Sequence, residues 1–202
     1  AMDCLSKAVV SSHSDLGVIF DTDVDRAACV GKDGFEINRN RLVALASEIA
    51  LEGCPGGTIV TDSVTSDGLA AFIAAKGGKH LRFKRGYRNV INKQLELCAE
   101  GVKCPLAMET SGHAAFAENY FLDDGAYLIT KLIIKAAALA ERGLALESLI
   151  DGLAEPAEER ELRFKILCDD FRPVGEKVIA HFERVAAECA GWSACPDNYE
   201  GI

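Results

Sequence analysis

Three aspartates at alternate positions, followed by an arginine, form the stretch of this sequence whose residue types could do chemistry. Asp21, Asp23 and Asp25 come directly after an apolar run at residues 18–20. Side chains two residues apart in an extended segment point to the same side, so the three carboxylates can converge. Converging carboxylates repel one another unless a cation lies between them, and hard oxygen ligands suit Mg²⁺. The stretch therefore predicts a strand, a magnesium-binding loop and a second strand.

The residue after the aspartates adds a group that can hold phosphate. Arg26 carries a planar guanidinium whose geometry suits phosphate oxygens. A calcium loop of the EF-hand type is excluded, because it requires Gly at its sixth position and Glu at its twelfth. Arg26 and Lys32 occupy those positions. A solvated acidic turn remains open as the simpler interpretation.

The composition is that of an ordinary globular protein. The chain has 202 residues, of which 49% are hydrophobic and 26% charged, enough for one or two domains with a real core. The formal net charge of −9 disfavours general binding to nucleic acid or to anionic membranes, because both require a basic surface. The longest apolar stretch, at residues 127–139, is interrupted by Lys131 and Lys135. We therefore expect neither a nucleic-acid partner nor a membrane partner.

The eight cysteines form no C-x-x-C pair and no zinc-type spacing. Cys29, Cys54, Cys98 and Cys168 lie within or beside apolar runs. This pattern predicts buried free thiols in a reducing compartment. Since no secretory signal is visible either, we expect a cytoplasmic protein, or one in another reducing compartment such as a plastid.

Strand and helix patterns alternate along the rest of the chain, with Asn40 as the predicted cap of the first long helix. The predicted elements are a hairpin at residues 27–37, helices at 40–53, 66–76, 87–99, 123–142, 144–153 and 174–189, and strands at 58–61, 79–83, 105–108 and 161–167. This order predicts an α/β fold of βαβ layers around a mainly parallel mixed sheet, flanked by partial α/β units. Binding loops collect at the carboxyl ends of such strands, so residues 62–66, 84–89 and 109–113 become candidates.

Four stretches, in this order and spacing, resemble the α-D-phosphohexomutase family of phosphoglucomutases and phosphomannomutases. The first resembles the family's magnesium loop and the last its sugar-recognition loop. They are FDTDVDR at residues 20–26, TIVTDSVTSDGL at 58–69, FKRGYRNVI at 83–91 and METSGH at 108–113.

The resemblance also implies a domain organisation, since members of that family have four domains. Residues 1–54 would be the end of the second domain, residues 55–155 the third, and residues 156–202 the incomplete start of the fourth. The family's phosphoserine loop belongs to the first domain and its phosphate-gripping loop to the fourth. The resemblance thus implies a fragment or a shortened relative that is inactive alone and acts with the remaining domains or a second chain.

The activity that the resemblance implies is Mg²⁺-dependent phosphoryl transfer between the 1- and 6-positions of a hexose phosphate, with hexose 1,6-bisphosphate as intermediate. Asp21, Asp23 and Asp25 would hold the ion, and Arg26 would support the phosphate.

The resemblance assigns roles in the other two loops as well. Glu109 and Ser111 would bond sugar hydroxyls, Gly112 would allow close backbone approach, and His113 would assist proton transfer. Lys84, Arg85 and Arg88 would contact substrate. Arg88 stands where many relatives have a lysine, and it keeps the charge in a larger, bidentate group. Arg26, His113 and Arg88 are the residues expected to be catalytic.

Two other functions stay open. The chain could be a non-catalytic binding or assembly subunit built from a mutase fold. The hydrophobic strand that leads into Asp21-Thr22-Asp23 also resembles the haloacid dehalogenase-like phosphatases, with Asp21 as nucleophile and Asp23 as acid/base, but this leaves Asp25 and Arg26 unexplained. In the mutase-derived accounts we expect an exposed sheet edge near residues 16–20 or 27–30, where a partner chain or a second copy pairs.

Overall fold

The computed structural model describes residues 1–160, 162–192 and 199 and contains two β-sheets. The first is antiparallel, in the order β1-β2-β3, and the second is a four-stranded sheet in the order β5-β4-β6-β7. The strands are β1 Leu16–Phe20, β2 Ala27–Gly31, β3 Glu36–Ile37, β4 Thr58–Asp62, β5 Lys79–Phe83, β6 Leu106–Met108 and β7 Ala114–Phe116. The helices are α1 Met2–Ser12, α2 Arg39–Gly53, α3 Asp67–Ala75, α4 Tyr87–Ala99, α5 Gly125–Ala140 and α6 Arg172–Glu188, with 3₁₀ turns at Ala117–Asn119 and Leu146–Ile150.

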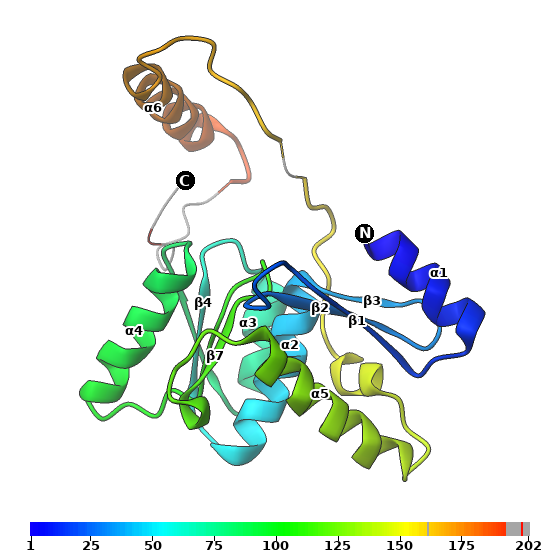
Figure 1. Ribbon diagram of the computed structural model, residues 1–202. Coiled ribbons are helices and arrows are strands. Elements are labelled where there is room, and N and C mark those ends of the chain that lie inside the picture. Colours follow the sequence, from blue (N-terminus) through cyan, green and yellow to red (C-terminus); the bar gives the residue numbers. More distant parts are fainter. Residues whose placement is uncertain (161, 193–198, 200–202) are drawn as a thin grey trace.

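The second sheet is the expected mainly parallel one. β4 pairs in parallel with β5 and β6, and only β7 is antiparallel, against β6. Alternate residues of β4 face opposite sides, so Ile59 packs with α2, α3 and α5, whereas Val60 packs with α4. Helices therefore cover both faces of this sheet, and the two sheets lie beside each other with α5 running from one toward the other (Figure 1).

The amphipathic pattern located most elements correctly. The predicted strand at residues 79–83 and helix at 87–99 match β5 and α4, and the acidic stretch lies in the loop between β1 and β2. The predicted cap Asn40 is wrong, because Asn38 precedes the first helical residue of α2. Asn40 is instead buried, and its side-chain oxygen accepts a hydrogen bond from the amide of Ser66 at 3.1 Å.

Several other expectations need correction. No element was predicted for residues 1–14, which contain α1, and the predicted helix at 144–153 is the 3₁₀ turn Leu146–Ile150. Of the two positions expected for a sheet edge, 16–20 or 27–30, the first is an edge among the described strands, because β1 pairs only with β2, whereas β2 pairs with both β1 and β3. β7 was not predicted at all.

The predicted strand at residues 161–167 is also wrong over its described part, residues 162–167. Its apolar residues Leu162, Phe164 and Leu167 are each more than 70% exposed, and α6 has no buried residue. A strand needs a neighbouring strand for its hydrogen bonds, and none of the described residues supplies one here. In Figure 1 this extended segment leads away from the two sheets to α6. Cys168 is accordingly exposed rather than buried, and the seven described cysteines are all free thiols.

None of the helices in the described part of the chain is long and apolar enough to cross a membrane.

A buried glutamine joins α4 to the strands beneath it. Gln94 is fully buried, and its amide nitrogen donates to the carbonyl oxygens of Cys104 at 3.0 Å and Ala115 at 3.2 Å. These bonds connect one helix to the segments before β6 and within β7, so they fix the position of the loop that joins those strands.

We predict that Gln94→Leu lowers the free energy of unfolding by about 1–3 kcal/mol, because two buried carbonyl groups lose their donor. Urea unfolding followed by circular dichroism measures this change. Asn92→Ala, an exposed change on the same helix, should stay within about 0.5 kcal/mol of the original chain. Equal stability of the two variants would contradict the role given to Gln94.

Candidate functional site

The three aspartates of the acidic loop converge. Carboxylate oxygens of Asp21, Asp23 and Asp25 all lie within 4.8 Å of one another. Asp21 holds the two ends of the loop together, because it accepts hydrogen bonds from the Arg26 Nε at 2.7 Å and from the Arg26 amide at 3.2 Å. Val24, at the turn of the loop, adopts a left-handed backbone with φ of 67°. The loop therefore gathers hard oxygen donors around one point.

The electrostatics of this cluster differ from one carboxylate to the next. Burial raises the pKa of Asp25, and the charges of Asp23 and Asp21 raise it further, against the opposing charge of His113. Desolvation acts in the same direction on Asp21, but the hydrogen bonds and charge of Arg26 lower its pKa overall. The Oδ1 atom of Asp25 is buried and has no hydrogen-bond partner among the described residues. This donor set fits a divalent cation such as Mg²⁺, which would offset the repulsion and be coordinated by this oxygen.

Two glycines fix the acidic loop against the second sheet. The carbonyl oxygen of Gly112 accepts a hydrogen bond from the amide of Ala27 at 3.4 Å, and the amide of Gly125 donates to the carbonyl oxygen of Val24 at 3.2 Å. A Cβ atom added at Gly112 would lie 2.5 Å from the carbonyl oxygen of Ala27, and one added at Gly125 would lie 2.8 Å from the carbonyl oxygen of Val24. The close approach that Gly112 permits within this chain is thus to the backbone of Ala27.

His113 connects the acidic loop to the start of α5. Its Nδ1 atom lies 2.8 Å from Asp123 Oδ2 and 3.7 Å from Asp25 Oδ2, and its ring stacks on Tyr87 with the centroids 4.9 Å apart. Burial alone would lower the pKa of His113, but the hydrogen bond to Asp123 and the charges of Asp123 and Asp25 outweigh it and raise the pKa. Asp25, His113 and Asp123 also form a second group whose ligand atoms lie within 4.8 Å of one another.

Asp123 and Tyr87 were not singled out as site residues from the sequence. The sequence predicts a helix that begins at Asp123, and Asp124 lies at the start of α5, where its side chain accepts a hydrogen bond from the amide of Tyr127. Asp123 faces His113 instead. Sequence spacing gives no signal that separates these two neighbouring aspartates.

The three loops at the carboxyl ends of β4, β5 and β6 meet, as their placement in a parallel sheet predicts. Glu109 is almost fully buried, and it accepts hydrogen bonds from the amide of Gly86 at 2.5 Å and from Ser111 Oγ at 3.2 Å. Asp62 accepts two bonds from Thr110, one from its amide at 3.1 Å and one from its hydroxyl at 2.8 Å. Burial raises the pKa of Asp62, although the Thr110 bonds oppose this shift.

The basic residues divide into two groups. Arg26, Arg85 and Ser111 line a common cavity of about 490 Å³, together with Arg39, Asn40, Val64, Thr110, Glu159, Arg160 and Arg163. Lys84 and Arg88 do not line this cavity; Lys84 is exposed, and the Arg88 Nε donates to the hydroxyl of Tyr87 at 3.1 Å. Arg85 therefore lines the same cavity as Arg26, whereas Arg88 lies beside the ring of Tyr87, which stacks on His113.

The sheet, its helices and these loops define a phosphohexomutase-type α/β protein, and comparison with known proteins makes the assignment specific. A family model described as "Phosphoglucomutase/phosphomannomutase, alpha/beta/alpha domain III" matches residues 38–156. The chain belongs to the phosphoglucomutase/phosphomannomutase family.

Individual relatives support the same assignment. The phosphomannomutase/phosphoglucomutase of Pseudomonas aeruginosa is 34% identical over 132 residues, which are 65% of this chain and 27% of that protein. The phosphoglucomutase of Neisseria gonorrhoeae is 29% identical over 75% of this chain and 32% of its own length. The crystal structure of a family member from Burkholderia thailandensis has a TM-score of 0.63 at 33% identity and covers 76% of this chain and 31% of that one. This chain thus spans about a third, or less, of the length of these relatives.

We predict that Gly112→Ala destabilises the chain more than Gly101→Ala does. Both glycines have positive φ, of 104° and 84°, but a Cβ atom meets the backbone of Ala27 only at Gly112 and finds open space at Gly101. Gly101→Ala should cost about 1–2 kcal/mol for the backbone alone, and Gly112→Ala about 1–3 kcal/mol more for the displaced segment. Chemical denaturation measures both variants, and equal losses would contradict the tight contact.

We also predict that Asp123→Asn lowers the pKa of His113. NMR titration of the His113 ring in chelator-treated protein measures this change. Since that pKa is raised in the folded chain, the stabilisation by His113 is fully present below the ordinary imidazole pKa and is lost as pH rises through the raised value. The variant should lose this contribution. Asp33→Asn, an exposed change in the hairpin turn, should leave the titration unaltered. An unchanged titration in Asp123→Asn would contradict the assignment.

Proposed function

We propose that this chain is the metal- and sugar-binding part of a phosphoglucomutase- or phosphomannomutase-type enzyme, which moves a phosphoryl group between the 1- and 6-positions of a hexose phosphate. One observation carries the proposal: in a member of this family, the acidic loop and the loop at residues 109–113 are bonded to each other through Ala27 and Gly112. Groups suited to a cation and groups suited to a sugar therefore share one site.

In this proposal, Asp21, Asp23 and Asp25 hold Mg²⁺, and their clustered oxygens fit that role. The bound ion would neutralise charge on the transferring phosphoryl group. Arg26 supports the phosphate, because one edge of its guanidinium is fixed by Asp21 while half of the side chain stays exposed at the basic cavity. Arg85 lines the same cavity and adds a second guanidinium.

The loop at residues 109–113 binds the sugar. Ser111 Oγ donates to Glu109, so a sugar hydroxyl can take its place and donate to the same carboxylate. His113 has its Nδ1 atom engaged with Asp123, which leaves Nε2 to exchange a proton with a sugar hydroxyl. Lys84 would contact the substrate and Arg88 would act in catalysis, as the family resemblance implies. Arg88 lies beside Tyr87, whose ring stacks on His113.

The remaining parts of the enzyme belong to the proposal as well. The chain spans 27–34% of the length of three of the relatives that it matches. The family resemblance assigns the phosphoserine and the phosphate-gripping loop to other domains, so we propose activity for the complete assembly, with hexose 1,6-bisphosphate as its intermediate. A partner chain or second copy would pair with β1, which is an edge among the described strands. A non-catalytic assembly role is the second candidate, favoured by that same edge.

The deciding experiment measures conversion of glucose 1-phosphate to glucose 6-phosphate with Mg²⁺ and a trace of glucose 1,6-bisphosphate. The 202-residue chain alone should be inactive, and the first and fourth mutase domains, added as separate polypeptides, should restore activity. Ser111→Ala should reduce the restored rate. If no activity returns although light scattering shows that the pieces assemble, the non-catalytic role is favoured. Activity of the chain alone would overturn the assignment of the phosphoryl carrier to another domain.

A separate prediction concerns the cation. Mg²⁺ should raise the thermal unfolding temperature of the chain, because a ligand that binds only the folded state stabilises it. Asp23→Asn should abolish this shift, whereas Asp15→Asn, an exposed change of equal charge on the same hairpin, should retain it. The shift should also weaken as pH falls through the raised pKa of Asp25, because only the ionised carboxylate binds the ion. An equal shift in both variants would contradict the metal site.

A further inference from the structure

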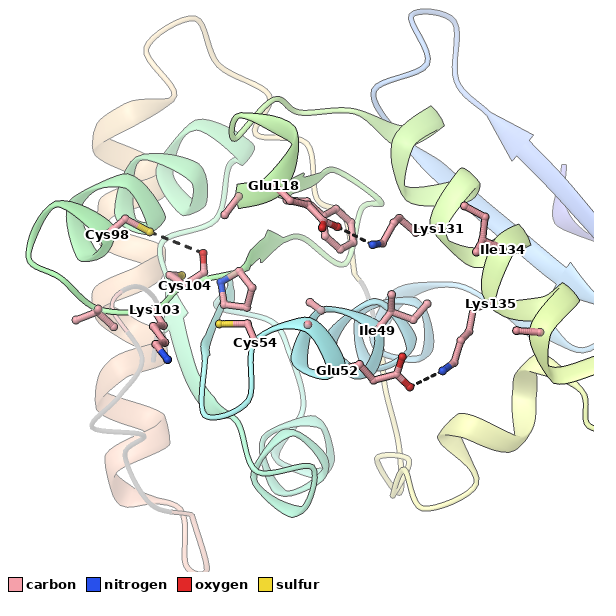
Figure 2. Close-up of a pocket in the computed structure, with 17 residues that line it drawn as sticks. Ile49, Glu52, Cys54, Cys98, Lys103, Cys104, Glu118, Lys131, Ile134 and Lys135 are labelled. Atoms are coloured by element: carbon pink, nitrogen blue, oxygen red, sulfur yellow. Dashed lines mark hydrogen bonds and ion pairs between the residues drawn. The ribbon is translucent and has the colours of Figure 1, made fainter.

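A second cavity lies at the end of the main sheet opposite the acidic loop. It has a volume of about 770 Å³ and is walled by the ends of α2 and α4, the segment before β6, the turn after β7 and the side of α5. The strands β4 and β6 begin at this end, whereas the loops of the candidate site follow their carboxyl ends. Figure 2 shows residues from these walls around the same space, with Cys98 and Lys103 across from Lys131 and Lys135.

The lining is apolar, with charge confined to a few lysines and glutamates. Ile49, Pro105, Phe116 and Ile134 contribute apolar surface, and Ile134 is 62% exposed although it belongs to this wall. A volume of roughly 300–1,000 Å³ with mainly apolar walls and few polar groups is typical of small-molecule sites. The cavity therefore has the size and surface of a site for a compact apolar body.

The charges around the cavity do not cancel. Lys131 pairs with Glu118 at 2.7 Å, and Lys135 pairs with Glu52. Lys103 is exposed and has no carboxylate partner among the residues that the structure describes. Three lysines thus face two glutamates, a local excess of positive charge in a chain whose net charge is −9. An anionic group on the ligand would find its counter-charge at Lys103.

The cysteines of the wall behave as apolar surface. Cys98 directs its sulfur toward the carbonyl oxygen of Cys104 at 3.8 Å, and burial raises the pKa of Cys104 to about 12. A neutral thiol does not repel an anion, and it packs as a small hydrophobic group. Among the described residues, the two groups whose atoms lie close enough to hold a metal ion contain no cysteine. The sulfurs of Cys54, Cys98 and Cys104 therefore do not make this wall a metal site.

We propose that this cavity binds a small amphipathic anion, a carboxylate on an apolar chain or ring. The apolar part would pack between Ile49, Pro105 and Phe116, and the carboxylate would pair with Lys103. Such a site is separate from the mutase chemistry, because it shares no lining residue with the cavity that contains Arg26 and Ser111. The experiments below therefore test it independently of the proposed function.

Decanoate is a suitable probe, and the thiols of the chain provide the readout. Cys54 and Cys98 line the cavity and are partly accessible, whereas Cys4 and Cys168 are exposed elsewhere. Decanoate should slow alkylation of Cys54 and Cys98 by iodoacetamide, measured by peptide mass spectrometry on the whole chain, and should leave Cys4 and Cys168 unaffected. The uncharged 1-decanol should protect about tenfold less effectively, the equivalent of one charge-assisted hydrogen bond.

Two variants test the wall itself, and circular dichroism establishes that each is folded. Lys103→Ala should weaken decanoate binding about tenfold, and Ile134→Glu, a change at an exposed position, should also weaken it by adding a negative charge. Lys7→Ala on α1, which removes the same charge elsewhere, should bind as the original chain does. Equal slowing at all four cysteines, no slowing at Cys54 and Cys98, or unchanged binding in Lys103→Ala would each overturn the proposal.

Discussion

The arrangement of the candidate site depends on one contact, the backbone bonding between the acidic loop and the two segments that contain Gly112 and Gly125. The acidic loop belongs to a small antiparallel sheet, whereas the groups suited to a sugar belong to the larger mixed sheet. Only side-chain-free residues at positions 112 and 125 let these backbones approach. Because carboxylates in one loop repel one another, the loop also needs rigid neighbours to keep them converged. The same contact thus joins the sheets and holds the charge cluster together.

One histidine and two buried carboxylates make further contacts between the loops of the site. His113 lies between Asp25 of one loop and Asp123 at the start of α5, so its positive form would be stabilised from both sides. Glu109 and Asp62 are buried acids that avoid an unpaired state by accepting bonds from neighbouring loops. These two buried acids therefore connect loops, whereas the carboxylates around Asp23 are more accessible.

Sequence periodicity located the regular elements because each helix and strand has to bury one face. The predicted bounds of the helix at residues 87–99 and of the strand at 79–83 equal the observed ones. What the sequence missed depends on distant partners. Asn40 bonds to Ser66, Gln94 bonds across to β7, and Asp123 differs from Asp124 only by facing His113. The failed strand after residue 160 has the same cause, since its pattern is apolar but no described neighbour pairs with it. Aspartate spacing, in contrast, was sufficient to predict that Asp21, Asp23 and Asp25 converge.

The paired glycines also bear on how this family can be recombined. A chimaera that joins two relatives between α2 and β4 would combine the acidic loop of one parent with the β6–β7 loop and the start of α5 from the other. Gly125 and Gly112 show that these segments are fitted to each other at the level of backbone atoms. The transferable unit is therefore discontinuous in sequence: residues 21–27 have to travel with residues 109–125. A crossover placed at the expected domain boundary between residues 54 and 55 would divide that unit.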